Sequence, residues 1–202
     1  MRLACVRRCH PWMIAAGCLA VFLSGCNTPQ TTQLDLTAPA SAEQDTSTTS
    51  SKSSLGVAWL PIDDQRLDAT SLGNIGNCAY VTKSILPWVD QQLHAIKGTN
   101  FGEAGDPAKA DLVIKPILLK LYIQNVNITK SAVVVFRLEL SSHGKSVGEL
   151  TCRGRYAGMN WSGSDDEMTG AIQKAFADCV SNITASLELN IKLQHTAVLT
   201  SG

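Results

Sequence analysis

The sequence predicts an α+β fold, a two-layer sandwich in which a mostly antiparallel sheet of about four strands carries two amphipathic helices on one face. Three observations predict it. Strand-like segments follow one another between residues 110 and 160, one amphipathic segment precedes them, and a second follows them. Consecutive strands pair readily as antiparallel neighbours, and a helix with one apolar face needs a sheet to cover it. The expected order is strand, helix, three strands, helix.

The first half of the domain is predicted to hold one strand and one helix. Residues 56–62 read as a strand, and a loop rich in glycine and asparagine follows it. Segment 79–96 then shows helical spacing. Pro87 either kinks this helix or marks its first turn, with Ser84 as the cap. The apolar face of the helix consists of Val81, Ile85, Val89, Leu93 and Ile96.

The second half begins with a predicted run of three strands. An apolar stretch covers residues 110–126, and at Pro116 we expect a bulge or an edge because proline lacks a backbone donor. Residues 132–140 show the clearest two-residue period in the chain. Residues 142–145 form a turn, and residues 147–160 return as the partner strand.

The closing helix has the strongest start signal. Ser164 and Glu167 form an S-x-x-E capping box, and acidic residues lie at the positive end of the helix dipole. We expect the helix to end near Leu193. Its apolar face consists of Ile172, Ala175, Phe176, Cys179, Ile183 and Leu187.

The N-terminal segment indicates where the protein is located. Three arginines precede an apolar run that ends in Leu23-Ser24-Gly25-Cys26. This is the pattern of a secretory signal, and it is too short to span a bilayer. The last four residues resemble the lipobox of bacterial lipoprotein precursors. The resemblance implies cleavage between Gly25 and Cys26 and acylation of Cys26 with chains such as palmitate; two or three chains anchor a protein firmly.

The chain is therefore predicted to have four parts. Residues 1–25 are a cleaved signal peptide, residues 26–54 a lipidated cysteine with a Ser/Thr-rich tether, residues 55–193 the α+β domain, and residues 194–202 a flexible tail. We expect the tether to be disordered because it has little apolar surface to bury. Asn27 differs from the Asp that resembles an inner-membrane retention signal, which favours the outer membrane, facing the periplasm.

Charge argues against nucleic acid as a partner. The 17 basic residues lose Arg2, Arg7 and Arg8 with the signal, and the remaining 14 face 17 acidic residues, a net charge near −3. This leaves no basic excess to attract a polyanion.

Three cysteines remain besides Cys26. Cys78, Cys152 and Cys179 are each in phase with an apolar face, so all three are expected to point at one core. The periplasm permits disulfides, so either two of the three pair or all three are packed thiols. Distance decides the pair, and the sequence leaves it open.

The sequence contains no recognisable catalytic, metal or cofactor constellation. Its histidines are scattered, its acidic pairs fall at a strand end and a helix cap, and it has neither a nucleophile elbow nor a phosphate loop. We therefore expect a protein that is not an enzyme and that needs no cofactor and no metal.

Two surface features are candidates for partner binding. Arg137, Arg153 and Arg155 are expected on the open face of the sheet, and Trp161 follows the last strand. Arginine and tryptophan are common interface anchors. The alternative is a solvated sheet face with the tryptophan packed under the helix cap.

The order of elements behind the lipobox resembles a loose group of small envelope lipoproteins: the YajG-type family, the N-terminal domain of TolB and the curli-secretion lipoprotein. Residues 57–62, residues 110–114 and the helix from Asp165 carry the resemblance. It implies a non-catalytic accessory in envelope assembly, stability or transport that contacts an envelope protein. The alternative is a periplasm-facing binding module for an envelope glycan or lipid, which a concave apolar pocket would favour.

Overall fold

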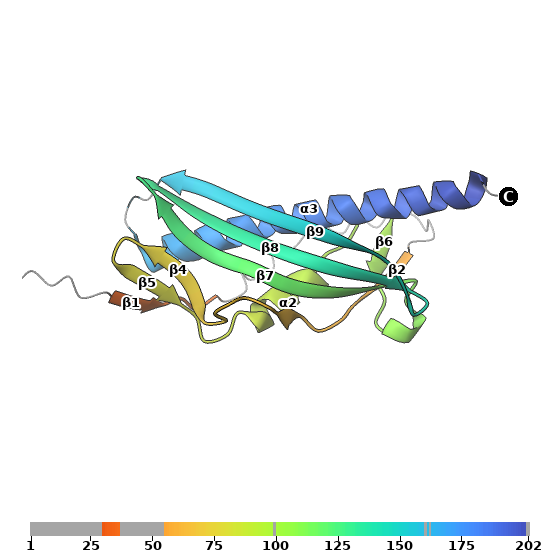
Figure 1. Ribbon diagram of the computed structural model, residues 1–202, viewed down its shortest axis with the longest axis horizontal. Coiled ribbons are helices and arrows are strands. Elements are labelled where there is room, and N and C mark those ends of the chain that lie inside the picture. Colours follow the sequence, from red (N-terminus) through yellow and green to blue (C-terminus); the bar gives the residue numbers. More distant parts are fainter. Residues whose placement is uncertain (1–29, 37–54, 99, 160, 162, 201–202) are drawn as a thin grey trace, which may run out of the picture.

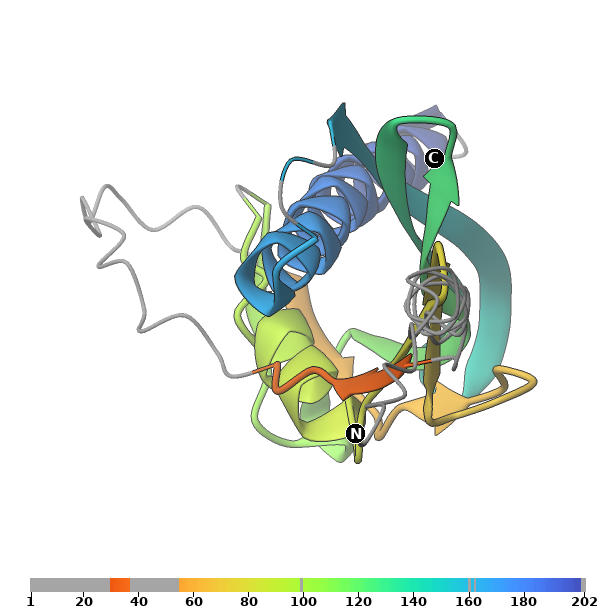
Figure 2. The ribbon, with the colours of Figure 1, turned by 90° about the vertical axis from the view of Figure 1, so that its left-hand side faces the viewer.

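A computed structural model describes residues 30–36, 55–98, 100–159, 161 and 163–200, with side chains as far as Ile191. In this structure a strongly curved sheet of nine strands forms a half-barrel, and two helices, α2 and α3, lie along its concave side (Figures 1 and 2). The predicted four-strand, mostly antiparallel sandwich is therefore wrong. The sheet has many more strands, mixes parallel and antiparallel pairs, and curls around the helices.

The elements have the following bounds along the chain: β1 Gln30–Gln33, β2 Leu55–Trp59, β3 Asp63–Asp64, β4 Ser71–Ile75, β5 Cys78–Val81, α2 Leu86–His94, β6 Phe101–Glu103, a 3-10 turn Pro107–Lys109, β7 Leu112–Val126, β8 Thr129–Ser142, β9 Lys145–Met159 and α3 Asp165–Thr200.

Strand β7 is the centre of the sheet. On one side it begins the antiparallel meander β7–β8–β9, which corresponds to the predicted run of three strands. On its other side the short strands β2, β3 and β4 pair with it in parallel, one after another. Strand β6 extends β2 in parallel, β5 pairs antiparallel with β4, and β1 adds to β5 in parallel. Parallel pairing needs a crossover between strands, and an alternating pattern within one strand gives no sign of it.

Pro116 lies inside β7 because of this arrangement. Strand β2 pairs with β7 as far as Ile114, and β3 takes over at Ile117, so the proline falls between the two pairings. Its missing donor therefore costs no ladder hydrogen bond on that side. No bulge occurs at Pro116, which stays in register with Leu138 of β8; the register with β8 shifts only further along, between Leu118 and Lys120.

The helix predicted over residues 79–96 is wrong in its first part. Strands β4 and β5 form a short hairpin there, and Val81 belongs to β5. The turn consists of Gly76, with φ 58°, and Asn77, a residue pair that favours tight hairpins. The two strands are too short for a two-residue period to outweigh the apparent helical spacing.

Helix α2 begins only at Leu86. Pro87 lies in its first turn, one of the two predicted positions, where the missing N–H costs nothing. The N-cap is Ile85, which makes no side-chain cap hydrogen bond, so Ser84 is not the cap.

The predicted tether also needs correction. Residues 30–33 form β1, and Leu34, only 1% exposed, belongs to the core. The backbone N–H of Leu34 donates to Val81 O at 2.8 Å. Leu34 and Leu36 are apolar residues in a polar segment, and their burial ties this part of the chain to the domain. The rest of the tether, residues 37–54, lies outside the described residues, as do the signal peptide and Cys26.

Helix α3 starts as the sequence predicts. The backbone N–H of Glu167 donates to Ser164 Oγ at 3.3 Å. Its apolar face contains the predicted residues and extends to Met168 and Ile191. The backbone is helical as far as Thr200, beyond the position near Leu193 where we expected the helix to end.

Helix α3 packs closely on β9, the edge of the meander. A side chain at Gly154 would drive its Cβ into the Ala175 carbonyl oxygen, so glycine is what lets the helix approach. Two α3 side chains then bond the strand: Asp178 Oδ2 accepts from Arg155 N, and Asn182 Nδ2 donates to Arg153 O, both at 2.9 Å. The helix thus covers part of an edge that would otherwise be open to pairing.

Among the described residues, neither helix combines the length and apolar character needed to cross a bilayer.

Candidate binding groove

A groove of about 500 Å³ lies between helices α2 and α3. These helices run beside each other across the open side of the half-barrel (Figure 2). The groove is lined on α2 and the residues after it by Trp88, Gln92, Ala95 and Ile96, and on α3 by Gly170, Gln173, Lys174, Phe176, Ala177 and Val180.

Packing of large side chains beside small ones explains why the groove exists. Trp88 and Phe176 meet edge to face with ring centroids 4.7 Å apart, and Phe176 packs in the same way on Phe136 from β8, at 5.9 Å. These rings join the two helices to the sheet. At the surface Ala95 and Ala177 are too small to fill the space between the helices.

The floor of the groove is apolar, with one unsatisfied donor. Trp88 is 5% exposed, and within the described part of the chain its indole Nε1–H has no hydrogen-bond acceptor. Buried donors are nearly always paired, so Trp88 Nε1 is an exception. The atom has almost no accessible surface, so it is closed off from the groove and forms no part of its binding surface.

The rim of the groove is polar. Gln92 comes from α2, and Gln173 and Lys174 come from α3. Lys174 Nζ also lies 4.9 Å from the centroid of the Tyr156 ring, a cation–π contact that holds the lysine above β9. An apolar floor inside a polar rim is the usual composition of a protein-binding surface.

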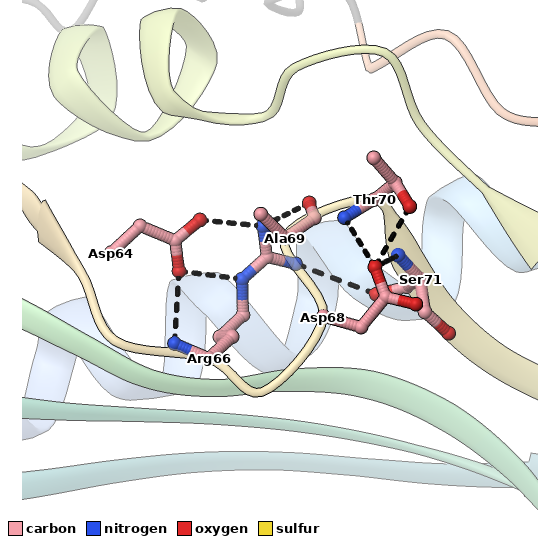
Figure 3. Close-up of polar contacts among 6 residues, drawn as sticks. All are labelled: Asp64, Arg66, Asp68, Ala69, Thr70 and Ser71. Carbon is pink, nitrogen blue, oxygen red and sulfur yellow. Dashed lines mark hydrogen bonds and ion pairs between the residues drawn. The ribbon is translucent and has the colours of Figure 1, made fainter.

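Apart from the groove, a cluster of polar side chains lies in the loop between β3 and β4 (Figure 3). The Arg66 side chain is 4% exposed and makes a two-point contact with Asp64, from Nε at 2.9 Å and from Nη2 at 2.8 Å. These hydrogen bonds lower the pKa of the Asp64 carboxyl, against the opposing effect of burial. Arg66 also donates to the Ala69 carbonyl oxygen at 2.5 Å.

Asp68 closes the same loop. Its Oδ1 accepts from the backbone N–H of Thr70 and of Ser71 and from the Thr70 hydroxyl (Figure 3), and the Thr70 bonds contribute most to a lowered pKa. Every donor in the cluster belongs to the loop itself. The cluster therefore fixes the loop's shape, which is a structural role for Asp64 and Asp68.

The three cysteines that were expected to point at one core differ in burial. Cys152 on β9 and Cys179 on α3 are buried in the core, and Cys78 on β5 is half-buried with its Sγ 3.2 Å from Thr32 Oγ1. All three are free thiols in the structure. Burial, followed by the neighbouring Cys152, raises the pKa of Cys179 to about 12, and burial raises that of Cys152. Both buried thiols are packed as small apolar groups.

The predicted surface residues do not form one patch. Register places Arg137, Arg153 and Arg155 on the same face of β8 and β9. Arg153 and Arg155 are exposed, whereas Arg137 is half-buried and donates to Gln65 Oε1 at 3.2 Å. Trp161 is 83% exposed and follows the end of β9, roughly 20 Å along the chain from Arg155 at strand spacing. The alternative of a tryptophan packed under the helix cap is wrong.

The groove was not predicted, although most of the residues that line it lie in segments predicted to be helical. The sequence predicted both helices on one face of the sheet, but it gave no sign of a groove between them. Among the described residues, no group of His, Cys, Asp or Glu side chains could hold a metal ion.

No protein family matches the sequence, and no curated protein matches it. The structure is similar to that of protein XCC0632 from Xanthomonas campestris, assigned to the family DUF330. The match has 10% sequence identity and a TM-score of 0.50, and covers 83% of this chain and 99% of that one. The two proteins share a fold at this level of identity.

Two further solved structures match less well. Lipoprotein GNA1162 from Neisseria meningitidis has 12% identity and a TM-score of 0.29, covering 61% of this chain and 98% of that one. A PelC dodecamer from Paraburkholderia phytofirmans has 17% identity and a TM-score of 0.33, covering 62% and 86%. Because both scores fall below 0.5, we base the fold comparison on the Xanthomonas structure.

Proposed function

We propose that this protein is a lipid-anchored, non-catalytic accessory of the bacterial cell envelope that holds an apolar segment of a partner protein between α2 and α3. The observation that carries the proposal is the groove, with its apolar floor and polar rim. The anchor is the acylated Cys26 that the lipobox implies, and the expected location is the outer membrane, facing the periplasm.

The shape of the groove favours a peptide segment as the occupant. Its α3 wall runs from Gly170 to Val180, which is about 15 Å at 1.5 Å per residue. That length matches two to three turns of an amphipathic helix, which would place a few apolar side chains on the Trp88–Phe176 floor. Gln92 and Gln173 can bond polar groups along the edge of such a segment.

The test is site-specific photo-crosslinking in cells. A photoreactive phenylalanine analogue replaces Gln173 at the rim, and the adduct is identified by mass spectrometry. We expect one adduct with an envelope protein, crosslinked through a single short segment. A second substitution, Ala177→Trp, fills the groove and is expected to abolish this adduct.

The matched control is Ala185→Trp. Ala185 is an exposed alanine on the same helix outside the groove, so the same change there should leave the adduct intact. Loss of the adduct in both variants would contradict the proposal. An adduct with the mass of a phospholipid or glycan in place of a protein would also contradict it, and would favour the ligand-binding alternative.

A further inference from the structure

One end of the molecule gathers turns from three parts of the chain. Strand β1 begins there, and the Gln30 N–H donates to Asn77 O in the β4–β5 turn at 3.1 Å. Asn74 of β4 lies opposite Gln124, close to the end of β7. These contacts bring the β7–β8 turn, Asn127–Ile128, to the same end (Figure 1). We call this the anchor end.

The anchor end exposes apolar side chains. Val126 and Thr129 pair across the β7–β8 turn, and Thr129 pairs with Met159 on β9. Around this pairing four large apolar residues are open to solvent. We call them the apolar tip: Val126, 52% exposed, Ile128, 75%, Met159, 54%, and Trp161, 83%.

The tip stands on a fixed base. Directly beneath it Lys130 Nζ forms an ion pair with Glu167 Oε1, and the Lys130 side chain is only 5% exposed. Glu167 also accepts from the backbone N–H groups of Trp161, at 3.1 Å, and Gly163, at 3.0 Å. These bonds hold the backbone at Trp161 and the start of β8, at Lys130, against the start of α3. Exposed apolar groups held in one arrangement indicate a surface used for binding.

The position of β1 decides what the tip faces. Three residues lie between Cys26 and Gln30, where β1 starts, so four Cα–Cα steps join the two. A chain of that length spans at most about 14 Å. If Cys26 carries the lipid, the anchor end is held within that distance of the bilayer. The long tether expected from the sequence would have allowed the domain to stand away from the membrane.

We infer that the apolar tip inserts into the surface of the membrane that holds the Cys26 lipid, so that the domain stands end-on. This inference rests on the proposed lipid anchor. Tryptophan and aliphatic side chains suit the interface between headgroups and acyl chains. Asp165 and Asp166 are exposed at the same end, so the expected surface is zwitterionic, and anionic lipid would weaken the contact.

Trp161 provides the measurement. Trp59 and Trp88 are buried at 7% and 5% exposure, and Trp12 leaves with the signal peptide. The full lipidated protein is reconstituted into phosphatidylcholine vesicles whose acyl chains carry bromine, which quenches indole emission on contact. Subtracting the emission of Trp161→Phe isolates the signal of Trp161. We expect a blue shift and loss of about half of that signal or more, because interfacial side chains reach the acyl boundary.

Two variants separate insertion from mere proximity. Ile128→Asp and Met159→Asp place charges in the tip, and each should restore most of the Trp161 emission. His143→Asp changes the polar turn at the opposite end of the meander and should restore none. Unquenched, unshifted Trp161 emission in vesicle-bound wild-type protein would overturn the inference and leave the tip as a surface for a protein.

The intact mass of the protein tests the anchor separately. A mass without acyl chains contradicts the lipid anchor. A fully acylated protein whose Trp161 is not quenched contradicts only the insertion of the tip.

Discussion

The two ends of the β7–β8–β9 meander close with turns of the same size, but the surface is apolar at one end and polar at the other. The β7–β8 turn at the anchor end is Asn127–Ile128, flanked by the apolar tip. The β8–β9 turn at the far end is His143–Gly144, flanked by Ser142 and Lys145, and the nearest exposed apolar residue is Val147, 42% exposed. Turns of this size tolerate polar residues best. The apolar side chains at the anchor end are therefore not required by the turn, and we relate them to binding.

The ends also differ beneath the surface. Lys130, one residue into β8, is buried and paired with Glu167, whereas Lys145, the first residue of β9, is exposed. At the anchor end, Tyr80 Oη also donates to Gly163 O at 3.3 Å, and burial raises its pKa to about 12. The anchor end thus combines an interior joined by an ion pair and hydrogen bonds with an apolar exterior. This arrangement is expected of a rigid binding surface.

The largest expected effect tests this interior. Lys130→Ala leaves the Glu167 carboxylate without its buried partner and should lower the free energy of unfolding by about 4 kcal/mol. Urea denaturation measures it. Lys145→Ala at the far end should change stability by less than about 0.5 kcal/mol. Equal effects at the two lysines would show that the anchor end is no more rigidly built than the far end.

A second change separates α3 from β9. Gly154→Ala drives a methyl group against the Ala175 carbonyl and should cost about 3 kcal/mol, because the backbone has to shift. Thermal unfolding checks this prediction against Ser146→Ala, an exposed position on β9 near the far turn, where we expect almost no change. A tolerated alanine at 154 would mean that the helix does not hold the strand closely.

A third prediction concerns the pH dependence of the Asp64–Arg66 contact, which lies between the two ends of the meander. The pKa of Asp64 is lowered in the folded protein, so its contribution to stability is present above the ordinary carboxyl pKa near 4 and is lost as pH falls through the folded value. Asp64→Asn should cost about 2 kcal/mol at pH 7. The gap between wild type and variant in urea midpoints should narrow below about pH 4. A gap that stays constant with pH would rule out the Arg66 contact as its cause.

The smallest expected effect compares the turns themselves. Asn127 has φ 59° and His143 has φ 47°, a region that glycine adopts without strain. Replacing either residue by alanine should cost about 1 kcal/mol, and replacing either by glycine should be close to neutral. If the two alanine variants differ widely in Tm, contacts with neighbouring residues determine the stability of these turns more than local backbone strain does.

Local patterns predicted the meander and the closing helix. The alternation at Ala132–Leu140 matches buried positions in β8, and the Ser164 cap forms as expected. Both depend on contacts between residues close in sequence or in consecutive strands. The short strands β1 to β6 pair mostly with distant parts of the chain, and their two to five residues are too few to show a period.

The candidate surfaces show the same difference between features that local sequence predicts and features that depend on distant pairings. The sequence indicated Met159 and Trp161, at the end of the last strand, as a possible surface feature, but Val126 and Ile128 were treated only as parts of a strand and a turn. They became one tip when register placed the ends of β7, β8 and β9 together. The groove likewise needed two helices, far apart in the chain, to lie side by side with the small residues Ala95 and Ala177 in its lining.

The sequence by itself determined the lipobox at Cys26 as a prediction, the three-strand meander, the start of α3 and the apolar face that buries Cys179. These depend on local chemistry, such as caps, turns and side-chain period. Only the tertiary structure decided that the sheet curls into a nine-strand half-barrel over the described residues, that Leu34 ties residues 30–36 to the core, and that the apolar tip lies at the anchor end. These features arise from pairings between residues far apart in sequence, whose register is set when the whole core packs.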